Sequence, residues 1–241
     1  MCTVTFWPQH HGYRLAMNRD EKWTRAPGLP PTRQQFGART GICPREPNGG
    51  TWIGLNDCGI TFALVNWYSR PQPTIAQPIS RGRIVLQMLP ATTVREARTI
   101  ISPAHLGHIL PFRLAGIFPE ESAVREWQWD GRDCHEVSHP WKPQQWISSG
   151  WDEANAQRIR GQFFATKAHQ STAGSRGWLR RLHRSHQPER GPFSTCVHRT
   201  DAGTVSYTEI EWTKHRGAMT SITGCPCQAL PQTTTRVSLE A

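Results

Sequence analysis

Residues 60–65, which read Ile-Thr-Phe-Ala-Leu-Val, constrain the fold more than any other segment because five of these six residues are apolar. A strand with one face in water alternates apolar and polar residues, whereas a strand covered on both faces is a continuous apolar run. Turn residues at 56–59 precede the run, and a second extended segment occupies 51–55. These segments predict a hairpin whose second strand lies in a sheet covered on both sides.

The remaining pattern predicts more hairpins and two groups of helices. Apolar residues between turn residues predict two hairpins, one from 2–7 with 13–18 and one from 204–212 with 218–223. They also predict strands at 111–118, 124–129 and 134–138. Helical periodicity and capping residues indicate helices at 81–89, 93–101 and 153–168. The proline-rich stretch 27–47 predicts a long loop that would serve as a lid, 174–191 predicts a loop with one short helix, and the last ten residues should fray. The expectation is one domain over residues 1–241, with two sheets stacked between helical layers.

Charge and cysteine content narrow the class of protein. No apolar run approaches the roughly 20 residues of a membrane span, and the amino terminus lacks a positively charged leader, so we expect a cytoplasmic protein without a membrane span. Seven irregularly spaced cysteines are typical of free thiols in a reducing compartment. The net charge of +10 raises nucleic acid as a partner, with basic residues concentrated between Arg158 and Arg190. No nucleic-acid-binding motif accompanies them, so a solvated Arg-rich surface is the preferred interpretation.

Cys2 is the first candidate for chemistry. Removal of the initiator methionine would leave a chain that begins with cysteine, so one residue would carry a thiol and an α-amine. The amine has a reference pKa near 7.7–8.0 and the thiol near 8.5, so the neutral amine can accept the thiol proton. By itself this position is weak evidence, since many proteins have cysteine as their second residue.

Four further motifs occur in order along the chain. They are Asn18-Arg19-Asp20-Glu21, the segment Gly49 to Asn56 continuing through Gly59 to Asn66, Arg81-Gly82-Arg83, and Ser194 to Arg199 continuing through Asp201 to Ser206. With Met1-Cys2, this set resembles the NRDE family, also called the Transport and Golgi organisation 2 family. The resemblance extends from residue 1 to about residue 213.

The resemblance implies an α+β fold, the four-layer αββα sandwich of the N-terminal-nucleophile hydrolases. By similarity to the bile-salt hydrolases and penicillin V acylases of that clan, Cys2 would be the nucleophile, Asp20 would hold its α-amine, and Asn66 would donate to an oxyanion. The NRDE motif itself adds Asn18 and Arg19 as candidate site residues, and Arg199 is a candidate because it matches a late arginine of the clan.

The sequence also departs from those acylases. They carry an arginine about three residues before the aspartate, where this chain has Met17, and a late asparagine, where it has Trp146 to Gly150, with Ser149 as a substitute donor. Because neighbours on a strand point to opposite faces, Arg19 and Asp20 are not expected to share one pocket.

Ordinary structural roles stay open for several of these residues. Arg19 and Asp20 would also suit an exposed ion pair, and Asn66 a turn at the end of a strand. His183, His186 and His198 with Cys196 are potential metal ligands, but no dependable carboxylate lies nearby, and Cys225-Pro226-Cys227 is too short a spacing for an ordinary zinc knuckle. The sequence therefore predicts polar roles for these histidines and no metal.

Two functions follow from the resemblance and the residues. The first is a cysteine amidohydrolase that cleaves a non-peptide C–N amide without a cofactor, acting on a small-molecule amide or acyl ligand. The second is a non-catalytic carrier of the same fold that binds haem, lipid or acyl-CoA, with Cys2, a histidine or the Cys225-Pro226-Cys227 segment as a haem ligand.

Overall fold

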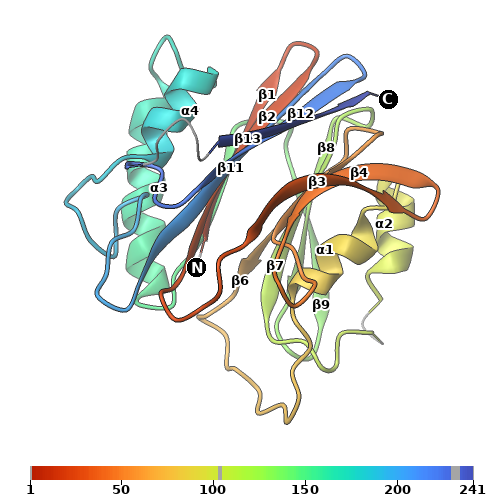
Figure 1. Ribbon diagram of the computed structural model, residues 1–241, viewed down its shortest axis with the longest axis horizontal. Helices are drawn as coiled ribbons and strands as arrows, with labels where there is room; N and C mark the ends of the chain where they lie inside the picture. The colour runs from red at the N-terminus through yellow and green to blue at the C-terminus, as the bar shows by residue number, and fades with distance from the viewer. Residues whose placement is uncertain (1, 103–104, 229–233, 241) are drawn as a thin grey trace.

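The chain folds into four layers, as seen in a computed structural model that describes residues 2–102, 105–228 and 234–240 (Figure 1). Two antiparallel sheets face each other in the middle, and a pair of helices covers the outer face of each. Sheet A has the order β10 (Gln144–Ser148), β1 (Cys2–Gln9), β2 (Gly12–Lys22), β11 (Ala202–Thr213), β12 (Arg216–Thr223), β13 (Thr234–Glu240). Sheet B has the order β3 (Leu29–Phe36), β4 (Arg39–Arg45), β5 (Ile53–Asn56), β6 (Thr61–Asn66), β7 (Phe112–Phe118), β8 (Ala123–Trp129), β9 (Cys134–His139).

The helices cover the two outer faces in pairs. Helices α3 (Glu153–Ala168) and α4 (Arg176–His183) lie on sheet A, and α1 (Gly82–Met88) and α2 (Val94–Ile100) lie on sheet B. The predicted caps are present, since Thr93 Oγ1 accepts from the Glu96 N–H at 3.1 Å and Asp152 Oδ1 accepts from the Asn155 N–H at 3.0 Å. None of the helices in the described part of the chain is long and apolar enough to cross a membrane.

Three apolar clusters fill the three spaces between the layers, which confirms the αββα sandwich. One joins the two sheets, one joins sheet B to α1 and α2, and one joins sheet A to α3 and α4. Strand β6 contributes to two of them, because Ala63 and Val65 belong to the cluster between the sheets while Phe62 and Leu64 belong to the cluster under α1 and α2. Strand β6 is therefore buried on both faces, as its continuous apolar run predicts.

The proline-rich stretch 27–47 is a hairpin rather than the loop or lid expected from composition. Its strands β3 and β4 form one edge of sheet B, and Pro30-Pro31 falls where the register shifts between Leu29 and Thr32. An edge strand tolerates proline because the missing N–H would not be needed for a second neighbour. The segment is therefore compatible with a strand despite its composition.

Two other segments also differ from expectation, and one agrees with it. Residues 234–240 are not frayed, because β13 pairs with β12 from Thr234 opposite Ile222 to Glu240 opposite Arg216. Strand β10 went unpredicted, and it pairs with β1 at the edge of sheet A. The short helix expected within 174–191 is present as α4.

The Arg-rich segment 158–190 is not the uniformly solvated surface that its composition indicates. Arg160 is only 2% exposed, and its side chain extends from α3 toward Thr3 and Asp20 of sheet A. Arg180 pairs with Glu209 at 2.6 Å, and Arg176 contacts Glu209 at 3.4 Å and Glu211. Part of the positive charge is thus neutralised by carboxylates of β11.

Candidate functional site

Cys2 lines a cavity of about 260 Å³ where the start of β1 faces the end of β6 and the start of α1. Asn66, the last residue of β6, and Arg81, just before α1, line the same cavity. Both sheets therefore contribute to it, and residues far apart in the sequence meet there. The thiol-bearing residue is 8% exposed.

The backbone of Cys2 is held between two strands. It lies opposite Arg19 on β2 and Ser148 on β10, and its N–H donates to Ser148 Oγ at 3.0 Å. Burial raises the pKa of the Cys2 thiol, and the nearby Asp20 carboxylate adds to the shift. The thiol is thus protonated near neutral pH and needs a base before it can attack. Met1, whose removal would expose the α-amine, lies outside the described residues.

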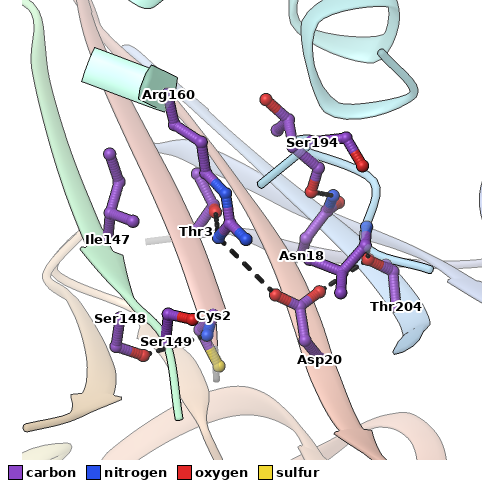
Figure 2. A network of polar contacts seen from close by, with 12 residues as sticks. Cys2, Thr3, Asn18, Asp20, Ile147, Ser148, Ser149, Arg160, Ser194 and Thr204 are labelled. Atoms are coloured by element: carbon purple, nitrogen blue, oxygen red, sulfur yellow. Dashed lines mark hydrogen bonds and ion pairs between the residues drawn. The ribbon is translucent and has the colours of Figure 1, made fainter. Parts of the chain in front are cut away.

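Asp20 belongs to a buried polar network on the helical side of sheet A (Figure 2). It is fully buried, and its Oδ1 accepts from Thr204 Oγ1 at 2.6 Å. The Arg160 guanidinium comes from α3, with Nη1 3.9 Å from Asp20 Oδ2 and 3.0 Å from Thr3 Oγ1. Burial raises the pKa of Asp20, and Arg160 opposes that shift. The cation beside Asp20 thus comes from a helix, whereas Met17 on the same strand is a core residue.

Arg19 directs its charge to the opposite side of β2. Its guanidinium lies 4.6 Å from the Trp52 ring centroid, and Nη2 contacts Glu46 at 3.0 Å and Glu21 at 3.4 Å. An exposed Arg19–Asp20 ion pair is therefore wrong: both residues are buried and have different partners. The expectation that they would not share a pocket is also wrong, because both line the cavity even though their charged groups point apart.

Asn66 presents its amide beside a tyrosine. Its Nδ2 donates to the Tyr68 hydroxyl at 2.8 Å, and the Arg81 guanidinium lies 6.0 Å from the Tyr68 ring centroid. Arg81 also donates from Nη1 to the Pro111 carbonyl at 3.2 Å. This end of the cavity therefore combines an amide donor, a phenol and a cation.

The second and third sequence motifs touch each other behind Arg81. The Thr51 N–H donates to the Gly82 carbonyl at 3.2 Å, and a Cβ at Gly82 would lie 2.5 Å from the Thr51 carbonyl oxygen. Only glycine lets the backbones of residues 51 and 82 come this close, because the two atoms nearest to a Cβ would be backbone atoms of Thr51, which cannot move aside as a side chain can. The contact sets the start of α1 against residues 50–51 and so places Arg81 at the cavity.

Two of the predicted site residues lie elsewhere. Asn18 donates from Nδ2 to the carbonyls of His183 and Thr195, both at 2.8 Å, so it ties β2 to the end of α4 and to the segment that precedes β11. Arg199 contacts Asp201 at 2.7 Å and stacks 4.7 Å from the Trp151 ring centroid. Neither is among the residues that line the Cys2 cavity.

Residues that sequence reasoning missed complete the site. Ser148, rather than Ser149, contacts Cys2, while Ser149 Oγ accepts from the Trp151 N–H at 3.3 Å. A signal for Arg160 was present, since it lies four residues after the buried Ala156 and so on the same face of α3. No signal in the local pattern pointed to Ser148 or Tyr68.

Candidate metal ligands lie outside the cavity, around His198. His183 is not among them, since it is buried with Nε2 3.0 Å from Thr5 Oγ1. Burial, with the Arg160 charge, lowers the pKa of His183 to about 3, so it is neutral.

Two solved structures share the fold of this chain. A mutant of the conjugated bile acid hydrolase from Clostridium perfringens is similar with a TM-score of 0.57 and 9% identity, over 100% of this chain and 92% of that one. Penicillin V acylase from Agrobacterium tumefaciens is similar with a TM-score of 0.52 and 10% identity, over 92% of this chain and 83% of that one. These likenesses establish an N-terminal-nucleophile hydrolase fold.

The sequence comparison identifies the family. No curated protein matches the chain. Residues 1–122, half of the chain, match the pattern of Transport and Golgi organisation 2, and this region contains Cys2, Asp20, Asn66 and Arg81. The chain therefore belongs to the Transport and Golgi organisation 2 family.

Proposed function

We propose that this protein is an amidohydrolase that cleaves a non-peptide C–N amide with Cys2 as its nucleophile. The observation that carries the proposal is the cavity that is lined both by Cys2 of one sheet and by Asn66 of the other. A buried thiol with a raised pKa needs a base beside it, and the α-amine of the same residue supplies one after Met1 is removed.

The chemical steps use groups within the site. The α-amine takes the thiol proton, Cys2 Sγ bonds to the amide carbon, and the C–N bond breaks as the amine returns the proton to the leaving nitrogen. Water then attacks the thioester, releases the acid and restores the thiol. Ser148 Oγ, an acceptor for Cys2 N–H at 3.0 Å, orients the nitrogen, and Asp20 stabilises the ammonium through its charge.

The oxyanion that forms in both halves of the reaction needs a donor. Asn66 Nδ2 supplies an N–H at the cavity, and Tyr68, its partner at 2.8 Å, orients the amide. A preorganised donor of this kind is worth about 100- to 1000-fold in rate.

The walls of the cavity indicate the kind of substrate. Arg19 and Arg25 are each paired with Glu21 and Glu46, whereas Arg81 has no carboxylate partner among the ion pairs of the described residues. A second cavity of about 260 Å³ shares Arg19, Arg25 and Trp52 with the first and adds apolar surface from residues such as Trp23 and Leu29. The preferred substrate is therefore an amide that joins an apolar acyl group to an amine-containing part with an anionic group for Arg81.

The test starts with the state of the amino terminus. Intact mass and peptide mapping after limiting iodoacetamide should show Met1 removed and Cys2 labelled ahead of the half-buried Cys58 and Cys134. A panel of N-acyl amino acids, with penicillin V and a conjugated bile acid, is then assayed for amine release. Cys2→Ala should abolish the activity, while the matched control Cys134→Ser retains it. Retained Met1, or full hydrolysis by Cys2→Ala, would refute the proposal.

The apolar second cavity also favours the alternative function, a carrier of a lipid or acyl ligand. A carrier would bind an acyl chain or haem without turnover, and Cys2→Ala would leave that binding unchanged if Cys2 is not a ligand. Saturable binding of acyl-CoA or a Soret shift with haem, combined with no amine release from the whole panel, would select this function instead.

A further inference from the structure

A cluster of sulfur and nitrogen donors surrounds His198 where β11 begins and β12 ends, outside the Cys2 cavity. Its Nε2 lies 3.7 Å from Cys196 Sγ, 3.8 Å from Cys225 Sγ and 3.6 Å from Cys227 Sγ. The sulfurs are also close to one another, at 3.6 Å between Cys196 and Cys225 and 3.2 Å between Cys225 and Cys227. His186 Nε2 is 3.1 Å from His198 Nε2.

These separations match the edges of a zinc tetrahedron. With Zn–S near 2.3 Å and Zn–N near 2.0–2.1 Å, tetrahedral geometry places neighbouring donors about 3.6–3.8 Å apart. Four of the five separations measured among Cys196, His198, Cys225 and Cys227 lie between 3.6 and 3.8 Å, and the fifth is 3.2 Å. All are well beyond the roughly 2.05 Å of a disulfide bond, and the cysteines are free thiols. The donor atoms of Cys196, His198 and Cys227, with that of His186, also lie within 4.8 Å of one another.

The backbone holds these donors in place without the ion. The Cys196 N–H donates to the Ser185 carbonyl at 3.0 Å, and the His198 N–H donates to the Gly191 carbonyl at 3.2 Å. After β12, the Gly224 N–H donates to the Val205 carbonyl at 2.8 Å, which sets the start of the Cys225-Pro226-Cys227 turn. Two short segments separated by a whole hairpin therefore supply two donors each.

We propose that Cys196, His198, Cys225 and Cys227 bind one structural Zn²⁺ ion. Three thiolates and an imidazole are a donor set that selects zinc over magnesium or calcium, and four protein ligands close the coordination sphere. The Cys225–Cys227 spacing, too short for a zinc knuckle, suffices here because the other two ligands come from the loop before β11. His186 lies next to this set as a neighbour of His198.

Charge around the cluster suits this ligand set. Three thiolates and Zn²⁺ carry a net charge of −1, and the exposed Arg190 lies with Nη2 3.3 Å from His198 Nδ1. When Nε2 of His198 binds the ion, Nδ1 carries the proton and cannot accept from Arg190, so zinc binding requires the exposed Arg190 guanidinium to leave this contact.

The ion would also restrict the movement of the hydrogen-bonded network around Asp20. Val197 lies between two ligands, and its N–H donates to Thr204 Oγ1 at 2.8 Å. Thr204 Oγ1 in turn donates to Asp20 Oδ1 at 2.6 Å. Zinc fixes the segment Cys196–His198 and, through Thr204, the orientation of the Asp20 carboxylate.

The metal content of the full chain tests this assignment. Protein purified without a His tag and under reducing conditions should contain about one zinc per chain by elemental analysis. Cobalt(II) substitution should give thiolate-to-cobalt charge-transfer absorption. Cys196→Ser and Cys225→Ser should each weaken zinc binding by more than roughly 100-fold, since even outer-shell changes cost 10- to 100-fold. The matched controls Cys58→Ser and Cys134→Ser should bind zinc normally.

A second measurement keeps the test decisive where a variant folds poorly. Wild-type protein treated with a chelator should lose thermal stability and recover it on addition of zinc but not magnesium. His198→Gln should lose the metal and His186→Gln should keep it; the reverse result would overturn the ligand assignment. Absence of zinc after reconstitution of reduced protein, or a disulfide among these cysteines in freshly purified protein, would overturn the site itself.

Discussion

Replacement of Arg160 by methionine is expected to destabilise the protein by about 4 kcal/mol at pH 7. The Arg160 side chain is 1% exposed, lies 3.9 Å from Asp20 Oδ2, and donates to Thr3 Oγ1 at 3.0 Å and the Pro192 carbonyl at 2.9 Å. Breaking a buried ion pair by removing one partner costs about 3–5 kcal/mol, because the other charge stays buried without compensation. Methionine keeps much of the volume, so the loss reports charge and hydrogen bonds more than packing.

Companion variants separate the charge from the rest. Arg160→Lys retains a cation but cannot reach the same set of acceptors, so it should cost less than Arg160→Met. Asp20→Asn removes the other partner. The double variant Asp20→Asn/Arg160→Met should be less destabilised than the sum of the two single variants by about 0.5–3 kcal/mol, the range of coupling for residues in one network.

Urea unfolding followed by tryptophan fluorescence at pH 7 and pH 5 measures these free energies. Burial already raises the pKa of Asp20, and loss of Arg160 raises it further. The penalty in Arg160→Met therefore applies above that pKa and disappears as pH falls through it, so the variant should be closer to wild type at pH 5. Additivity within about 0.5 kcal/mol, or a penalty independent of pH, would refute the idea that Arg160 acts through the Asp20 charge.

Three further variants test other parts of the structure. Gly82→Ala should lower thermal stability by about 2 kcal/mol or more, because its Cβ would lie 2.5 Å from the Thr51 carbonyl oxygen; unchanged melting would contradict that contact. Burial alone would raise the pKa of Glu126, but hydrogen bonds from His139 and Arg113 hold it at about 2 against an ordinary 4.5. Wild type should lose roughly 3 kcal/mol as pH falls from about 5 to 2, and Glu126→Gln should show a flatter acid profile in pH-dependent denaturation. Asn66→Ala should lower kcat about 100- to 1000-fold on any substrate found, with Cys2 alkylation unchanged; full turnover would remove Asn66 from the site.

Much of the fold could be predicted because it is encoded in local patterns. The apolar run at 60–65, the capping pair Thr93 and Glu96, and the helix at 153–168 all appear in the structure as expected. Each depends on residues close together in the sequence. The Pro30-Pro31 strand was missed because its tolerance for proline depends on its position at the edge of sheet B.

The candidate site was predictable only in part. Cys2, Asp20 and Asn66 could be named from the motifs, but Ser148 and Tyr68 had no local signal. Arg160 looked like one charge in a basic segment, and only the packing of α3 against sheet A makes it the cation beside Asp20. The proposed zinc ligands could not be predicted from the sequence either. The spacing of Cys196 and His198, and that of Cys225 and Cys227, was uninformative by itself.

The sequence by itself determined the alternation of strands and helices, the burial of β6 on both faces, and the motifs that mark the family, because these depend on periodicity and on residue types in order. The tertiary structure decided which side chains meet. Sheet pairing brings Cys2 against Ser148, helix packing brings Arg160 to Asp20, and the loop before β11 brings Cys196 and His198 to Cys225 and Cys227. These contacts join residues from about 30 to nearly 150 positions apart, and such long-range pairings leave no trace in the local pattern.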